Sequence, residues 1–281
     1  MLNIKQLESA LTTTETLGEV TQAFENIASI EIRRIKDRVI SSREFFHELW
    51  SVYSQLRIKE DEVFMSNRDV VYEKTALLVV SSDVSLTGGI DQRLINQVLS
   101  EYIASQHDLI VIGAHGEALL RVMGVKPAAV FKLPDVTKKI NVLPMIELVS
   151  KYRNSVVYYE SFVSLATQRI AHLELLFAVQ KLSMLEQNRP GGELIYSGDY
   201  IFEPSLEKVV EYMESMMLST ALTEVILESR LAQLASRFNA MSLAHTAAEK
   251  RADYLTTNIS RLKRQRADEG IRRHYLGVNN E

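Results

Sequence analysis

The sequence predicts a small central α/β domain flanked by two long terminal helices that pair as an antiparallel coiled coil. Three observations support this fold class. All five prolines lie between positions 126 and 205, while residues 19–87 and 205–269 contain neither glycine nor proline. Apolar residues recur every three or four positions in both of these terminal segments, and the middle alternates short apolar runs with amphipathic segments. We therefore expect helices at 1–60 and 204–281 and the α/β domain at 70–203.

The N-terminal helix is predicted from two runs of apolar residues at helical spacing. The first run is Leu17, Val20, Phe24 and Ile27, and the second is Ile32, Ile35, Val39, Phe46, Leu49, Tyr53 and Leu56, with Ser42 in one slot. The change of phase between them is a stutter, at which a supercoil relaxes locally. We expect Gly18 to be a weak point near the start of this helix.

The C-terminal helix is expected to begin after Ser205, which occupies an N-cap position, and to run to about residue 266. A helix of this length cannot bury its apolar stripe inside a small domain, so it must pack on the N-terminal helix. His245 lies on the stripe, where it would be a proton switch or, as we favour, a histidine that finds a partner within the coil or extends to its edge. The predicted coiled-coil core consists of Leu231, Leu234, Phe238, Met241, Leu255, Ile259 and Leu262.

The middle of the chain predicts a mostly parallel sheet. Buried strands are expected at 75–83, 108–113 and 155–162, because each is a short apolar run next to turn residues. Helices are expected at 93–104, 117–123 and 162–185 from their apolar spacing. Strands that alternate with helices in this way are typical of α/β domains.

Composition excludes several classes of function. The 281 residues carry a formal net charge of −4, so no overall positive field attracts nucleic acid or anionic lipid. The sequence has no cysteine, which excludes disulfides, thiolate metal sites and cysteine nucleophiles. No run of about 18 apolar residues occurs, so we expect no transmembrane segment.

The search for catalytic motifs finds two weak candidates, both at predicted strand ends. The string IGAHG at 112–116 is either a ligand-binding turn or a structural turn with Gly113 at positive φ. Asp83 either coordinates a cation or caps the next turn. We favour the structural interpretation of both, and a Walker phosphate loop and a zinc-binding histidine pair are absent from the sequence. We expect no catalytic residue, cofactor site or metal site.

A basic segment lies near the end of the predicted C-terminal helix. Arg261, Lys263, Arg264 and Arg266 fall within six residues, without aromatic residues between them. The segment is either a solvated helix end or a positive tip that meets an acidic partner or nucleic acid. The lack of interleaved aromatic residues argues against a platform that stacks single-stranded bases.

Several motifs, in a shared order, resemble the gamma subunit of F-type ATP synthase. SSDVSLTGG at 81–89 is similar to that family's strand-end motif through Ser82, Asp83, Leu86 and Gly88. YYESFVSLATQ resembles the family's Phe-x-Ser-x-x-x-Gln segment, and YIFEPS resembles its entry into the last helix. SRFNAM at 236–241 is similar to the stretch in which the family's last helix reads Arg-Met-x-Ala-Met, with Phe238 in place of the first methionine. The resemblance covers nearly the whole chain.

The resemblance implies a central rotary shaft that couples an ion-driven membrane rotor to ATP synthesis or hydrolysis in other subunits. The implied fold is the paired terminal helices with a Rossmann-like central domain. The implied partners are the alpha and beta ring subunits, the small epsilon stalk subunit and the membrane rotor ring. The shaft itself would carry no catalytic group and would lie peripherally on the cytoplasmic face of the membrane. Its partner-contacting tip would be Arg261, Arg264, Gln265 and Arg266.

The chain also departs from the family pattern. Val84 and Ser85 replace the usual basic residue and glycine of the strand-end motif, and the last helix does not preserve the family's Ile-Thr pair. These departures indicate a divergent branch. The alternative functions are a coiled-coil scaffold or nucleic-acid-associated protein with a basic C-terminal tip, and a small-molecule enzyme that uses Asp83.

Overall fold

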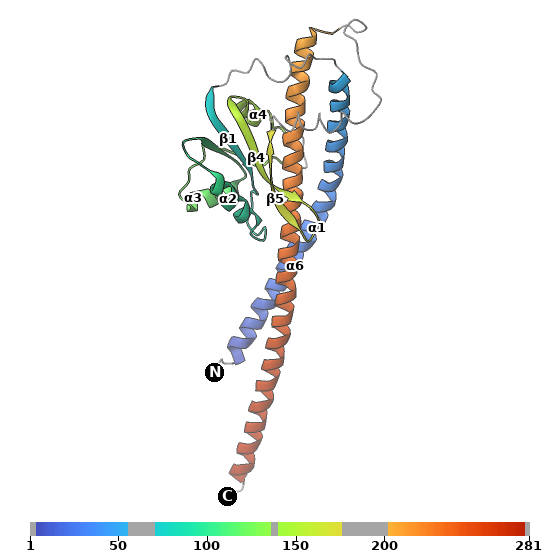
Figure 1. Ribbon diagram of the computed structural model, residues 1–281. Coiled ribbons are helices and arrows are strands. Elements are labelled where there is room, and N and C mark those ends of the chain that lie inside the picture. The colour runs from blue at the N-terminus through green and yellow to red at the C-terminus, as the bar shows by residue number, and fades with distance from the viewer. Residues whose placement is uncertain (1–3, 56–70, 136–139, 176–201, 279–281) are drawn as a thin grey trace. The chain divides into compact units, whose positions relative to one another are not determined.

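The computed structural model describes residues 4–55, 71–135, 140–175 and 202–278. The chain forms two compact units, one of residues Met1–Ser29 with Arg237–Glu281 and the other of residues Ile30–Ser236. The two long terminal helices contribute to both units, and each unit is described separately. The elements in chain order are α1 (Ile4–Gln55), β1 (Tyr72–Val80), α2 (Ile90–Glu101), β2 (His107–Ile112), α3 (Ala114–Val122), β3 (Ala129–Phe131), α4 (Leu143–Val149), β4 (Tyr152–Phe162), β5 (Gln168–Glu174) and α6 (Leu206–Val278) (Figure 1).

The sheet of the unit Ile30–Ser236 has five strands in the order β3-β2-β1-β4-β5. The first four are parallel, and β5 pairs antiparallel with β4. In β1 and β2 every residue of the central runs is apolar, as expected for parallel strands with both faces covered. This is the predicted Rossmann-like α/β arrangement with one added antiparallel edge strand.

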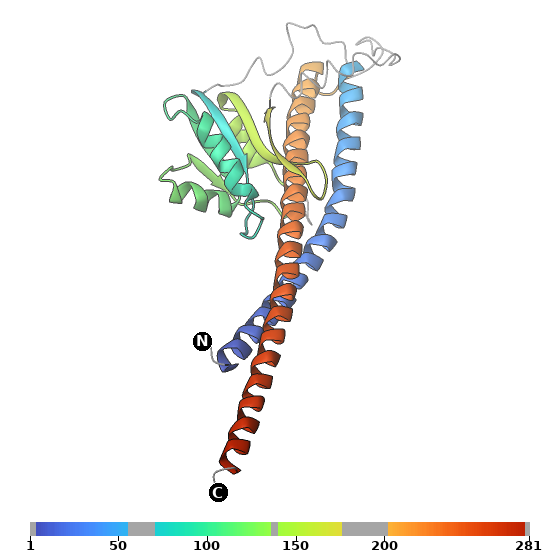
Figure 2. The same cartoon turned by 60° about the horizontal axis from the view of Figure 1, so that its bottom comes forward.

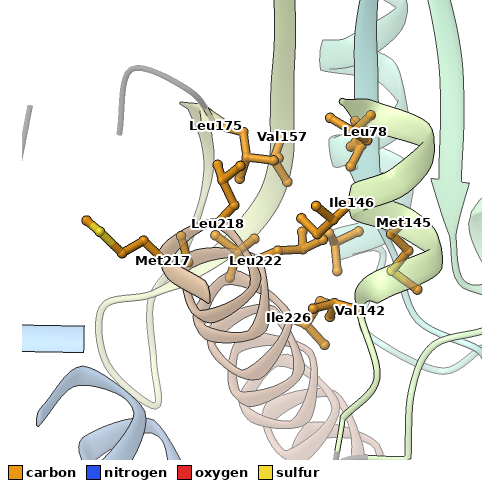
Figure 3. Close-up of a cluster of buried hydrophobic side chains, with 14 of the residues drawn as sticks. Leu78, Val142, Met145, Ile146, Val157, Leu175, Met217, Leu218, Leu222 and Ile226 are labelled. Carbon is orange, nitrogen blue, oxygen red and sulfur yellow. The ribbon is translucent and has the colours of Figure 1, made fainter. Parts of the chain in front are cut away.

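Helices cover both faces of this sheet. On one face α2 and α3 place Leu94, Ile95, Val98 and Leu120 against Leu77 and Val79 of β1. On the other face α4 and the first part of α6 pack against the strands. Figure 3 shows this second cluster, in which Leu218, Leu222 and Ile226 of α6 point toward Ile146 of α4 and Val157 of β4. Each fully buried side chain of this size contributes about 1.5–3 kcal/mol, so α6 is an integral layer of the domain.

Within the same unit α1 and α6 run antiparallel. Ile35 and Val39 of α1 are buried against Leu227, Leu231 and Leu234 of α6. Nearer the C-terminal end of α1, the hydroxyl of Tyr53 donates to Oε1 of Glu214 at 3.1 Å. Residues later in α1 thus meet residues earlier in α6, which confirms the predicted antiparallel pairing.

The helix boundaries follow from capping and from the absence of helix breakers. The N–H of Lys208 donates to Oγ of Ser205 at 3.4 Å, so Ser205 is the predicted cap of α6. The helix continues to Val278, beyond the expected end near residue 266. The expected ranges 1–60, 70–203 and 204–281 remain predictions, because the compact units divide both terminal helices internally.

The predicted helix at 162–185 is wrong where the structure describes it. Residues Gln168–Glu174 form β5, joined to β4 by a turn in which Thr167 N–H donates to the Ser164 carbonyl oxygen. Exposed Arg169, His172 and Glu174 alternate with half-buried residues, which is close to the period of an edge strand. Residues 176–185 lie outside the described residues. The short elements β3 and α4 had no prediction.

Candidate functional site

The unit formed by the two chain ends is a pair of helical segments, 4–29 of α1 and 237–278 of α6. The α1 segment lies beside the first part of the α6 segment, which continues past the N-terminus of α1 (Figure 1 and Figure 2). Two contacts fix their direction. Nζ of Lys263 lies 2.8 Å from Oε1 of Glu8, and the guanidinium of Arg237 lies 4.9 Å from the ring centre of Phe24. The segments therefore run antiparallel in this unit as well.

The buried faces of both segments follow a heptad pattern, with steps that alternate between three and four residues. On α6 the positions of this pattern, all buried or half-buried, are Phe238, Met241, His245, Ala248, Ala252, Leu255, Ile259 and Leu262. On α1 they are Ile4, Leu7, Leu11, Thr14, Gly18, Thr21, Glu25 and Ala28. Eight positions on each helix keep the same spacing, so the two faces match along their whole described overlap.

The face predicted for the start of α1 is wrong by one position. Leu17, Val20 and Ile27 are 54 %, 45 % and 48 % exposed, while Gly18 and Thr21 are buried. The seam of α1 contains small and polar residues, so the spacing of large apolar side chains alone does not reveal it. The spacing of Ile4, Leu7 and Leu11, extended through the threonines, is the signal that would have found it.

Gly18 is a buried packing position of the seam. Its carbonyl oxygen lies 3.0 Å from Nδ1 of His245. A carbonyl can only accept, so Nδ1 carries the proton and donates it. His245 therefore has a partner within the coil, as favoured from the sequence, and the missing side chain of Gly18 provides room for the imidazole ring.

The structure places the predicted core residues in both units. Leu231 and Leu234 are 5 % and 1 % exposed and belong to the cluster with Ile35 and Val39. The remaining predicted core residues lie on the heptad face of the terminal unit, where Met241, Leu255 and Ile259 are buried and Phe238 and Leu262 are half-buried.

The predicted tip residues Arg261, Arg264, Gln265 and Arg266 are all exposed on α6. Every residue from 263 to 273 is exposed. Within the described part of the chain, Lys263 pairs with Glu8 and Arg273 pairs with Glu269, but none of the three tip arginines has an ion-pair partner. The segment thus presents unpaired guanidinium groups to solvent.

The two strand-end candidates have structural roles. Oδ1 of Asp83 accepts a hydrogen bond from the N–H of Ala114 at 3.0 Å, at the N-terminus of α3. It also accepts from the N–H of Leu133 at 3.4 Å, which holds the segment after β3 in place. Gly113 has the predicted positive φ, at 111°. A Cβ at Gly113 would lie 2.3 Å from the carbonyl oxygen of Ser81, so backbone packing explains this glycine.

Among the residues that the structure describes, no cluster of three or more histidine or acidic residues could hold a metal ion. The described helices include none that is long and apolar enough to span a bilayer.

Comparisons with known proteins agree with this architecture. The sequence model of the family described as ATP synthase matches residues 3–268. The chain is 23 % identical to the ATP synthase gamma chain of Mesoplasma florum over 291 residues, with 99 % of each chain covered. It is 26 % identical to the gamma chain of Desulfotalea psychrophila, with 91 % of each chain covered.

Solved structures show the same fold. The chain resembles a rotor chain of the Euglena gracilis mitochondrial ATP synthase with a TM-score of 0.63 and 11 % identity, covering 93 % of this chain and 98 % of that chain. It resembles a central-stalk chain of the Tetrahymena thermophila mitochondrial ATP synthase with a TM-score of 0.56 and 19 % identity, covering 80 % of this chain and 99 % of that chain. The match over residues 3–268 shows that the chain belongs to the ATP synthase family, and the curated relatives identify it as a gamma subunit.

Proposed function

We propose that this chain is the central rotary shaft of an F-type ATP synthase, coupling rotation of a membrane rotor to ATP synthesis or hydrolysis in a ring of alpha and beta subunits. Its other partners are the small epsilon stalk subunit and the rotor ring. The observation that carries the proposal is the family match over residues 3–268, which spans both terminal helices and the α/β domain between them.

The paired helices supply the mechanical property that such a shaft needs. A single helix bends easily, whereas two helices with interlocking heptad seams resist bending and twisting. The cluster of Ile35 and Val39 with Leu227, Leu231 and Leu234 gives α1 and α6 a common buried seam within the unit that contains the sheet. Torque applied to that unit is therefore carried by both helices.

The shaft acts on the nucleotide sites by differential contact. A rod with unlike faces inside a ring of equivalent subunits contacts each of them differently. Each subunit is then biased toward a different nucleotide affinity, which is a shift of population between conformations. We assign this chain no catalytic group and no cofactor, and we place nucleotide and magnesium in its partners.

The basic segment is the proposed tip contact. Arg261, Arg264 and Arg266 are exposed, and residues described by the structure leave their guanidinium groups unpaired. Arginine forms strong, often bidentate hydrogen bonds with carboxylates, so acidic groups of the ring are suitable partners. Gln265 adds a neutral donor and acceptor at the same level of the helix. The core residues hold α1 and α6 together in each unit: Leu231 and Leu234 in the unit that contains the sheet, and Phe238, Met241, Leu255, Ile259 and Leu262 in the terminal unit.

The proposed location is the cytoplasmic face of the membrane, where the chain is held peripherally through the complex. The rotor is expected to conduct the coupling ion, a proton or a sodium ion. Purified membranes should release the chain together with the ring subunits under conditions that leave the rotor ring embedded.

The absence of cysteine allows a direct test of rotation. In a complex carrying Arg266→Cys, this cysteine is the single thiol of the shaft, and it can be labelled with a photo-crosslinker attached through a cleavable disulfide. A complex with the unmodified shaft, treated in the same way, controls for labelling of the other subunits. Illumination should link the shaft to a ring subunit and stop continuous ATP hydrolysis. Reductive cleavage of the arm should restore the activity.

The matched control is the same labelled complex kept in the dark, which should keep its starting activity. Full ATP turnover in complexes with a shaft-to-ring cross-link would contradict the rotary role. Binding of the isolated chain to DNA with a steep salt dependence, without assembly into a complex, would support the nucleic-acid alternative instead.

A further inference from the structure

A buried polar cluster lies where α6 crosses the carboxyl ends of β1 and β4. Asp91, in the first turn of α2, and Glu160, near the end of β4, are both 0 % exposed. Ser229 and Gln233 of α6 are also buried, at 0 % and 1 %. All of these residues belong to the unit Ile30–Ser236, and none has a part in the rotary proposal.

Asp91 accepts an unusually full set of hydrogen bonds. Its Oδ1 accepts from the N–H of Ser82 at 2.8 Å, and its Oδ2 accepts from Oγ of Ser82 at 2.7 Å and Oγ1 of Thr87 at 2.6 Å. Nδ1 of His115 lies 3.0 Å from the same Oδ2. Burial works to raise the pKa of Asp91, but the bonds from Thr87, Ser82 and His115 outweigh it and hold the pKa below the ordinary 3.8. Asp91 is therefore a buried carboxylate ion.

Glu160 is in the opposite situation. Its Oε2 accepts from Oγ of Ser229 at 2.7 Å and from Nε2 of Gln233 at 2.8 Å, which ties β4 to α6. Its Oε1 is buried and accepts no hydrogen bond within the described residues, but Asp91 is a side-chain hydrogen-bond partner for a proton held on Glu160. Burial, and next the charge of Asp91, raise the pKa of Glu160 well above the ordinary 4.5. Two carboxylates in one buried cluster cannot both ionise at low cost, so Glu160 holds a proton.

The other charged groups around the cluster are engaged elsewhere. Glu228 and Arg230 flank Ser229 on α6, but Glu228 accepts from Ser161 at 2.6 Å and Arg230 pairs with Glu31 at 3.3 Å. Arg237, one turn after Gln233, belongs to the other compact unit, where its guanidinium lies over the Phe24 ring and its Nε has no hydrogen-bond partner within the described residues. On β5 the residue opposite Glu160 is the apolar Ile170. Across the described ranges, no basic side chain forms an ion pair with Glu160.

We propose that Glu160 and Asp91 form a proton-dependent clamp, which holds α6 on the ends of β1 and β4 while one proton is bound and loosens the segment Ile226–Ser236 when that proton is lost. Loss of the proton places a second negative charge beside Asp91 with no cation to balance it. The Glu160 carboxylate can then be solvated only if α6 moves away from the strand ends. His115, whose side chain is 25 % exposed, connects Asp91 to solvent.

The clamp predicts a defined dependence of stability on pH. A glutamate in the unfolded chain titrates near 4.5, whereas Glu160 in the folded chain titrates well above that value. Between these two pH values the folded state binds one proton more, so the folding equilibrium constant falls by up to about tenfold per pH unit. Asp91 acts in a separate range, because its stabilising effect is lost only as the pH falls below about 3.8.

The test compares the full chain with Glu160→Gln, whose amide has the same shape but does not titrate. Denaturant unfolding and hydrogen exchange of residues 226–236, corrected for the intrinsic exchange rate, are followed from about pH 5 to about pH 9. The unmodified chain should lose stability and protection as the pH rises, and Glu160→Gln should lose this dependence. The matched control is Glu228→Gln, the neighbouring acid on α6, which should keep it.

Two further measurements keep the proposal testable if Glu160→Gln does not fold. Infrared spectra of the unmodified chain should show the carbonyl band of a protonated carboxylic acid at neutral pH, and this band should disappear at alkaline pH. Asp91→Asn removes the neighbouring charge and should shift this titration to lower pH. The clamp is refuted if the band is absent at neutral pH, or if Glu160→Gln folds and keeps the full pH dependence. These results are independent of the rotary role, since they concern the isolated chain.

Discussion

Replacement of Gly18 by alanine tests the packing of the terminal coiled coil with a single methyl group. Gly18 is buried in the seam and lies in the interior of α1 without a positive φ. The new Cβ would lie 3.6 Å from Cβ of Ala248 and 3.8 Å from Nδ1 of His245. Both distances are ordinary van der Waals contacts, so the methyl group fits without movement of its neighbours.

The expected gain comes from two sources. Alanine in a helix interior is more favourable than glycine by about 0.8–1 kcal/mol. Burial of one methyl group contributes up to about 0.8 kcal/mol more. Gly18→Ala should therefore stabilise the pairing of residues 4–29 with 237–278 by about 1–2 kcal/mol. Gly18→Leu should instead cost about 1–3 kcal/mol, because its extra atoms need the space of the His245 ring.

Hydrogen exchange of peptides within 4–29 and 237–278 measures this change directly, because it reports the local opening of the coil. A gain of 1.4 kcal/mol corresponds to about tenfold slower exchange of amides that open with the coil. Faster exchange in Gly18→Ala than in the unmodified chain would refute the packing described for this seam.

Three further changes test the core, the turn after β2 and the tip. The Leu234 side chain is 1 % exposed, so Leu234→Ala should destabilise the unit Ile30–Ser236 by about 2–5 kcal/mol in denaturant unfolding. The Leu243 side chain is 73 % exposed, so Leu243→Ala should change this stability by less than about 0.5 kcal/mol. Gly113→Ala should cost about 2 kcal/mol or more by the same measurement, because its Cβ would meet the Ser81 carbonyl oxygen at a φ of 111°. The double change of Arg264 and Arg266 to glutamine should leave thermal unfolding unchanged but lower the coupled ATPase rate of the reconstituted complex.

Each of these expectations has a contrary result. Equal losses of unfolding stability in Leu234→Ala and Leu243→Ala would mean that the stability of the unit Ile30–Ser236 does not depend on the burial of Leu234. A Gly113→Ala chain of normal stability would contradict the close approach to Ser81. For the tip, the same double change at Arg272 and Arg273 is the control, and an equal effect of the two pairs would mean that only the general charge of the segment matters.

Much of the fold could be predicted because the sequence signals are local. The lack of glycine and proline from 205 to 269 predicts one continuous helix, and buried parallel strands such as β1 are unbroken apolar runs. The error at β5 has a physical cause. An edge strand with one half-buried face contains enough apolar residues to fit a helical period as well, and only its antiparallel pairing with β4 distinguishes the two.

The candidate sites were less predictable, since they depend on contacts between distant residues. The seam of α1 uses Thr14, Gly18 and Thr21, whose side chains do not stand out as apolar. Asp91 and Glu160 are 69 positions apart, and only the fold brings both into the polar cluster below α6. Acidic residues in isolation are usually predicted to be exposed, so their burial could not be read from composition or spacing.

The pairing of Gly18 with His245 also determines how the two chain ends can slide past each other. A coiled coil has a repeating seam, so a slip by one heptad would preserve most of its apolar contacts. Such a slip would place His245 opposite Leu11 or Glu25, whose side chains occupy the space that Gly18 leaves open. The contact between Gly18 and His245 therefore fixes the axial register of the two helical segments, so that they do not slide by one heptad under load.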